Sequence, residues 1–112
     1  MNVIDMNEGN KITYFVDGTK INFNDELILN LAKYEQDEVI CIDICSDKNG
    51  NLSNGLANKY VAQIEIPKRE YVSTQSDNPD YNEEDETSKK LIEMKEPIPF
   101  DIEKVTLRLW AI

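Results

Sequence analysis

The sequence contains no histidine, which removes the side chain that most often acts as a general base or binds a transition metal. Its four glycines all fall in apparent turns, so no glycine-rich loop is present to hold a phosphate group. No nucleophile elbow and no cysteine–histidine combination occurs either. No spacing singles out a catalytic pair among the 22 acidic residues. We therefore predict that the protein is not an enzyme and uses no cofactor.

Basic residues are scarce, with 12 Lys and Arg against 22 Asp and Glu, which gives a net charge of −10. Direct binding to nucleic acid or to anionic lipid needs clustered cations and is therefore disfavoured. The first residues have neither the basic nor the apolar region of a signal peptide. The longest apolar-rich run, Val39 to Cys45, is interrupted by Asp43 and falls far short of the roughly 20 residues of a membrane span. We expect a cytoplasmic protein with no membrane partner.

The two cysteines, Cys41 and Cys45, lie four residues apart in a stretch that has the pattern of a strand. Four steps along a strand separate the Cα atoms by about 13 Å, whereas a disulfide tolerates about 7 Å at most. The two thiols therefore cannot bridge each other. A zinc site would need two further cysteine or histidine ligands, which the chain lacks, so we predict no metal site.

The clearest local pattern lies between Lys11 and Phe23, where two alternating apolar runs flank Asp17-Gly18. Asp-Gly at this place is typical of a two-residue type I′ hairpin turn. A turn centred on this dipeptide predicts three facing pairs: Val16 with Thr19, Tyr14 with Ile21, and Ile12 with Phe23. The large apolar side chains then share one face of a β-hairpin.

The residues after this hairpin have the pattern of a helix. Asn24 is a suitable N-cap, and Asp25 and Glu26 suit the positive end of a helix dipole. Apolar residues then follow at helical spacing: Leu27, Ile28, Leu31 and Tyr34. We predict a helix of about three turns that ends around Glu35 and packs on the sheet.

Three further segments alternate with the period of a β-strand. Val39 to Cys45 places three isoleucines on one face, and a second segment runs from Tyr60 to Ile66, where Pro67 stops it. In the last segment Val105, Leu107, Leu109 and Ala111 alternate with polar or aromatic residues up to Ile112. We predict that side chains from both ends of the chain share one core.

The Asp47-Lys48-Asn49-Gly50 run resembles the middle of a calcium-binding loop. Aligning Gly50 with the invariant glycine of that motif places Cys45 at its first position and Leu56 at its twelfth. Both positions need oxygen ligands, so the sequence predicts a plain turn here.

Residues 74–90 differ in composition from the rest of the chain and contain Ser, Asn, Pro and a run of acids. The acidic residues of this segment are Asp77, Asp80, Glu83, Glu84, Asp85 and Glu86. So few apolar side chains cannot offset the entropy of ordering the segment, and we predict a mobile acidic loop at 74–90. The loop is either a solvated surface or a mimic of DNA phosphates, although a mimic needs its charges held in place. Leu91 to Met94 after it suggest a short turn of helix.

Trp110 lies on the same face of the last predicted strand as Arg108 and Ile112, opposite the face that reads as buried. Tryptophan and arginine are enriched at the centres of protein interfaces, so these three residues form our candidate interface. The alternative is that this second face is also covered, by the helix or by Leu91 and Met94.

Two segments of the second half carry a family resemblance: Tyr60 to Pro67, and Phe100-Asp101 followed by Val105-Thr106-Leu107-Arg108-Leu109-Trp110. This part of the chain resembles small uncharacterised proteins of bacterial prophages, encoded near tail-assembly genes. The shared pattern is a strand that ends in Ile-Pro, a variable acidic segment, Pro-Phe-Asp and then Val-Thr-Leu-x-Leu-Trp. The resemblance implies a phage-associated structural or accessory role. It supplies no functional residues to transfer.

The sequence as a whole predicts one small α+β domain over residues 1–112, with an N-terminal hairpin, one helix and a mostly antiparallel sheet. An all-β fold is the alternative, should the segment from Leu27 to Tyr34 be extended. We predict a non-enzymatic interaction or structural module that binds a protein partner or itself. The alternative function is an acidic inhibitor, or DNA mimic, of a host enzyme that acts on DNA.

Overall fold

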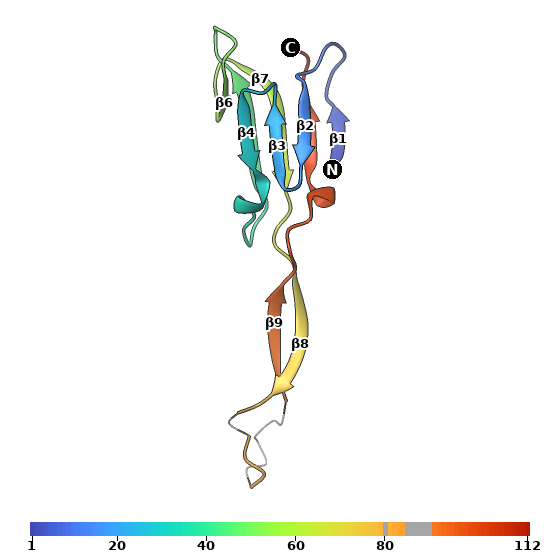
Figure 1. Cartoon of the computed structure of the whole chain (residues 1–112), viewed down its shortest axis with the longest axis vertical. Helices are drawn as coiled ribbons and strands as arrows, with labels where there is room; N and C mark the ends of the chain where they lie inside the picture. Colours follow the sequence, from blue (N-terminus) through green and yellow to red (C-terminus); the bar gives the residue numbers. More distant parts are fainter. Residues whose placement is uncertain (80, 85–90) are drawn as a thin grey trace. The chain divides into compact units, whose positions relative to one another are not determined.

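The computed structural model describes residues 1–79, 81–84 and 91–112 (Figure 1). The described residues form ten β-strands in three sheets and two 3-10 helices of three residues each. The predicted α+β class is therefore wrong, because the described chain is mostly β. No helix among these residues is long and apolar enough to span a membrane.

The chain divides into two compact units, one made of Met1–Arg69 with Phe100–Ile112 and the other of Glu70–Pro99. Strands from both ends of the sequence meet in the first unit, and the second unit is a hairpin with its connecting segment. A single domain over residues 1–112 stays a prediction, since a compact unit need not fold separately.

The first unit contains a five-stranded sheet in the order β1-β10-β7-β5-β6. Its strands are β1 (Asn2–Asp5), β10 (Thr106–Leu109), β7 (Lys59–Ile66), β5 (Ile40–Ser46) and β6 (Leu52–Asn54). β1 runs parallel to β10, and the other neighbours are antiparallel. The three strands predicted from alternation are confirmed, although the last one ends at Leu109 and not at Ile112. The 3-10 helix η2 (Ile102–Lys104) precedes β10 and is capped by Asp101, whose carboxylate accepts the Glu103 N–H.

A three-stranded sheet of β2 (Tyr14–Asp17), β3 (Lys20–Phe23) and β4 (Leu27–Asn30) contains the predicted hairpin. The hairpin is confirmed, but the predicted pairs are wrong, because Val16 faces Ile21 and Tyr14 faces Phe23. Gly18 has φ of +61° and is the first of the two turn residues, which is typical of a type II′ turn. Each residue of β2 pairs with a residue of β3 two positions later than predicted. Because a shift of two residues keeps the side of the sheet on which a side chain lies, the same apolar face points inward.

The predicted helix from Leu27 to Tyr34 is wrong. Its first residues form β4, and only the 3-10 helix η1 (Leu31–Lys33) follows. Asn24 and Asp25 both have φ of 55°, in the left-handed region, whereas an N-cap has an extended backbone. They form the turn between β3 and β4, and β4 then pairs Leu29 with buried Ile21. Pairing with a neighbouring strand therefore overrides the local helical pattern.

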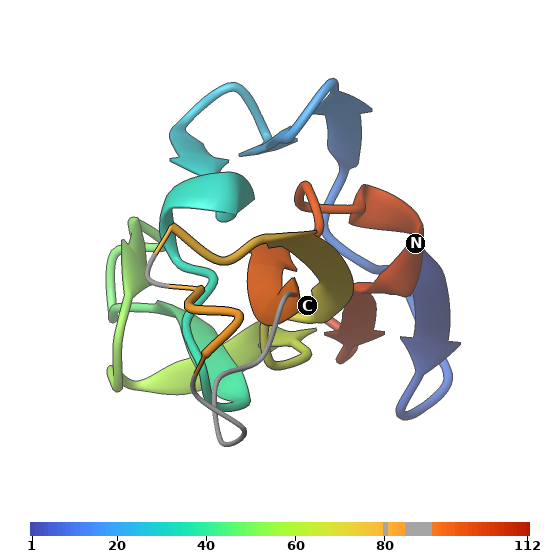
Figure 2. The same ribbon diagram turned by 90° about the horizontal axis from the view of Figure 1, so that it is seen from below.

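The core lies between the two sheets of the first unit, and Figure 2 shows β2 and β3 on one side and β7 on the other. Fully buried side chains come from both layers: Ile21, Phe23, Leu31, Ile44, Ile64, Ile66, Val105 and Leu107. In the described part of the chain, no residue between 70 and 99 belongs to this core cluster. The predicted common core of the two chain ends is confirmed.

The second unit consists of the antiparallel strands β8 (Tyr71–Asp77) and β9 (Leu91–Pro97). Thr74 to Asp77 are therefore strand residues, and the loop that we predicted from residue 74 begins after Asp77. The helical turn predicted at Leu91 to Met94 is wrong, because these residues begin β9. Asp80, Asp85 and Glu86 of the predicted acidic loop lie outside the described residues.

Candidate interaction surfaces

The outer face of the five-stranded sheet is the surface opposite the core. Thr106 and Arg108 of β10 face Glu65 and Gln63 of β7 there, and these four side chains are all half-buried. The pairing between β5 and β7 shifts at Ile44, so Ala62 faces Ile44 while Tyr60 faces Cys45 and Val61 is the extra residue. Such a bulge reverses the alternation of the strand, which turns Tyr60 outward and leaves Val61 buried.

Tyr60 and Trp110 form an aromatic pair on this outer face. Their ring centroids lie 5.4 Å apart with the planes tilted by 41°, a favourable arrangement for two aromatic rings. The Trp110 backbone N–H donates to the Val61 carbonyl at 3.1 Å, which fixes Trp110 just beyond the end of β10. Tyr60 is 39% exposed and Trp110 is half-buried. Partial desolvation and the nearby Asp43 charge raise the pKa of the Tyr60 hydroxyl, so it stays a neutral hydrogen-bond donor at neutral pH.

Arg108 lies on the same face as Trp110 and is held by neighbouring polar groups. Its guanidinium donates to the side-chain amide oxygen of Gln63 at 3.3 Å and forms an ion pair with the Glu65 carboxylate at 3.5 Å. Gln63 in turn donates to the Asp43 carboxylate at 3.0 Å. These contacts link β10, β7 and β5 across the face. They orient Arg108 next to the aromatic pair, with 26% of its side chain exposed.

Ile112, the third residue of the predicted interface, lies elsewhere. It is 59% exposed, and its N–H donates to the Asn10 carbonyl at 2.8 Å. Together with Ile12, Leu52 and Val61 it lines a mainly apolar groove of about 280 Å³. The structure therefore brings two of the three predicted residues, Trp110 and Arg108, onto one face.

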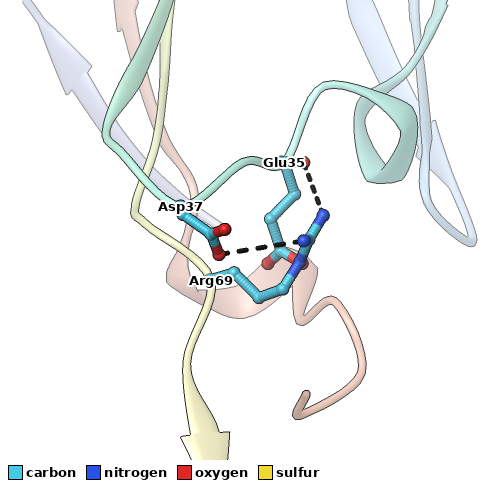
Figure 3. Close-up of polar contacts among 3 residues, drawn as sticks. All are labelled: Glu35, Asp37 and Arg69. Carbon is cyan, nitrogen blue, oxygen red and sulfur yellow. Dashed lines mark hydrogen bonds and ion pairs between the residues drawn. The ribbon is translucent and has the colours of Figure 1, made fainter.

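Arg69 joins two distant parts of the chain in a cluster that the sequence did not reveal (Figure 3). Its guanidinium donates to the Glu35 carbonyl at 2.9 Å and forms ion pairs with the carboxylates of Glu35 at 3.5 Å and Asp37 at 3.8 Å. Its backbone N–H donates to the Gln36 carbonyl at 2.7 Å. An open, polar hollow of about 420 Å³ lies beside these residues. A guanidinium donates hydrogen bonds but does not act as a general acid or base, so the cluster fits a structural role in holding the Glu35–Asp37 segment.

The Asp47 loop is a turn, as predicted. The Asp47 carboxylate accepts the N–H groups of Asn49 at 2.8 Å and Asn51 at 3.0 Å. These backbone hydrogen bonds lower the pKa of Asp47. The carboxylate therefore stabilises the turn. Within the described residues, no group of three or more potential metal ligands occurs.

The β8–β9 hairpin has a different surface. Four large apolar side chains, Tyr71, Val72, Leu91 and Met94, are between 44% and 46% exposed. Asp77, Glu83 and Glu84, which we predicted as part of an acidic loop, are exposed where β8 ends and in the segment that follows. This unit thus combines exposed apolar strand residues with an acidic end.

Comparisons with known proteins found no matching family model, no matching curated protein and no matching solved structure. The resemblance to prophage proteins therefore stays a prediction.

Proposed function

We propose that this protein is a non-enzymatic structural or accessory module that binds a protein partner through the outer face of its five-stranded sheet. The resemblance to prophage proteins suggests a partner from the same set of tail-assembly genes, in the bacterial cytoplasm. This role needs a stable scaffold and an anchoring surface. It needs neither a nucleophile nor a cofactor.

The observation that carries the proposal is the tilted Tyr60–Trp110 pair beside Arg108 on the outer face of the five-stranded sheet. Tyrosine, tryptophan and arginine are the residues most enriched among those that dominate binding energy. Aromatic rings also lose little conformational entropy on binding, since each has only two side-chain torsions. A partner that covers this face would bury the exposed part of both rings while Arg108 keeps its contact with Glu65.

The test is co-expression of the tagged full chain with the proteins encoded by neighbouring genes, followed by affinity capture. We expect Trp110→Ala to weaken capture by a factor of about 30 or more, as expected for an anchoring tryptophan. The matched control is Phe15→Ala on β2, which removes an aromatic ring that is 54% exposed on the other sheet. Equal capture by the wild type, Trp110→Ala and Tyr60→Ala would contradict the proposal, as would capture of no neighbouring gene product.

An acidic inhibitor of a DNA-acting enzyme is our second candidate function. The observation that favours it is that Asp77 ends β8 and that Glu83 and Glu84 follow in an exposed turn, because a two-stranded stem supports nearby charges better than an unstructured loop does. The test adds the full chain to a panel of restriction endonucleases and measures DNA cleavage. Inhibition that Glu83→Gln with Glu84→Gln relieves would support this candidate, whereas uninhibited cleavage would argue against it.

A further inference from the structure

The outer edge of β8 is a surface that the proposed function does not use. β8 pairs with β9 over seven positions, and β9 is its one strand neighbour in the described part of the chain. A strand with one neighbour presents alternate backbone N–H and C=O groups on its other side. From Val72 to Ser76 these groups form an edge that a further strand could pair with.

The hairpin also lacks the burial that normally stabilises strands. Of the seven residues in each strand, only Thr74 in β8 and Ile92 in β9 are half-buried, and all the others are exposed. An isolated two-stranded hairpin is marginally stable in water, and three or more strands with an apolar face are needed for independent stability. One face of this hairpin carries such a surface, since Val72 and Thr74 of β8 lie on the same side as Ile92 and Met94 of β9.

The side chains of β8 do not protect its edge. Natural edge strands are usually kept apart by lysine, proline, bulges or short length. β9 has such protection in Lys95 and Pro97, and the outermost strands of the five-stranded sheet, β1 and β6, have only four and three residues. β8 has seven residues, no proline and no lysine, and its stretch from Tyr71 to Ser76 is uncharged.

We propose that β8 pairs with β8 of a second copy of this chain, antiparallel and centred on Thr74. This register places Thr74 opposite Thr74, Val72 opposite Ser76 and Tyr71 opposite Asp77. No two like charges face each other, and a directly facing threonine pair is favourable. The result is a four-stranded sheet in which Val72, Ile92 and Met94 of both copies share one face.

The charge distribution selects this antiparallel direction. Residues 70–99 carry nine acidic residues and three lysines, and the described acids beyond Ser76 include Asp77, Glu83 and Glu84. Parallel pairing would bring the two acidic ends together, whereas antiparallel pairing points them in opposite directions. Repulsion between two copies of net charge −10 remains, and salt screens such repulsion between exposed charges. The association should therefore strengthen as the salt concentration rises.

The test is sedimentation equilibrium of the full chain up to about 1 mM, the range in which a small interface still associates, in about 0.5 M NaCl to screen the charge. Thr74→Lys and Thr74→Glu each place like charges opposite each other and should weaken the association about fivefold. An equimolar mixture of the two variants places Lys opposite Glu and should associate more tightly than either variant alone. Leu91→Lys, which adds the same charge on β9 and on the other face, is the matched control and should behave as the wild type.

A wild type that is monomeric over the whole range would overturn the proposal. A mixture of Thr74→Lys and Thr74→Glu no tighter than its components would overturn the register. Loss of the association in Trp110→Ala would also overturn the proposal, because pairing through β8 does not use Trp110. Since the partner-binding face and the β8 edge share no residue, either proposal can fail without the other.

Discussion

Replacing residues 71–97 by Asn-Gly should leave the first unit folded. The Ile98 N–H donates to the Glu70 carbonyl at 2.8 Å, which is the hydrogen bond that closes a four-residue turn. Asn-Gly placed between Glu70 and Ile98 would complete such a turn, and Asn-Gly is the dipeptide that type I′ turns prefer. The truncation removes both strands of the hairpin and keeps every residue of the core cluster.

The expected change in the free energy of unfolding follows from two terms. No buried core side chain is lost, so the cost of about 2–5 kcal/mol for truncating a large core residue does not arise. Closing a flexible loop costs about 0.6 kcal/mol for each doubling of its length, so shortening this connection would stabilise the first unit by about 2 kcal/mol at most. The hairpin has its own structure, which reduces that gain. We expect a change between about zero and +2 kcal/mol.

Urea unfolding of the full chain and of the truncated chain, followed by Trp110 fluorescence, measures this change. A dispersed amide NMR spectrum of the truncated chain checks that the two sheets remain. Destabilisation by more than about 2 kcal/mol, the cost of removing a core side chain, would refute the reasoning, because it would mean that residues 71–97 contribute to the core.

Three further predictions concern single residues. Leu107→Ala removes a fully buried side chain of β10 and should lower the free energy of unfolding in urea by about 2–5 kcal/mol. Thr106→Ala, on the outer face of the same strand, should lower it far less. Arg69→Lys keeps the charge but loses the hydrogen bond of the planar guanidinium to the Glu35 carbonyl. It should lower the free energy of unfolding by about 1 kcal/mol in the same assay and speed amide exchange at residues 36–38. Unchanged exchange at these residues would contradict the assigned role of Arg69. Backbone hydrogen bonds lower the pKa of Asp47, so its carboxylate should titrate below 3.8 by NMR. Its stabilisation of the turn is present above pH 3.8 and is lost as the pH falls through the folded-state pKa. Asp47→Asn should remove this pH dependence of the turn's stability.

Alternation in the sequence predicted the strands that carry the core, because β-branched residues at a period of two rarely fit another structure. The segment from Leu27 to Leu31 could not be assigned in the same way, since its apolar residues fit both a helix and a strand. The decision depended on backbone turns at Asn24 and Asp25 and on pairing with β3. Strand β9 and most of β8 were missed, because both faces of this hairpin are exposed and its sequence lacks a regular alternation of apolar and polar residues.

The candidate site was predictable only in part. Trp110 follows Arg108 by two positions, and such residues share a face wherever the alternation of a strand continues without a bulge. Tyr60 could not be placed beside Trp110, because the bulge at Val61 reverses the side on which it lies. The contact of Arg69 with Glu35 and Asp37 depends on tertiary structure, and no spacing in the sequence indicates it.

The position of β10 between β1 and β7 has a consequence for how the protein folds. β1 and β7 can join one sheet only after residues 106–109 have entered between them, so this step waits until these residues have been synthesised. Until then the hydrogen-bonding edge of β7 and the apolar residues Ala62 and Ile64 are open to other chains. Contacts between such distant segments slow folding, because the long loop must close before any of them forms. The newly made chain should therefore be most vulnerable to aggregation just before β10 is inserted.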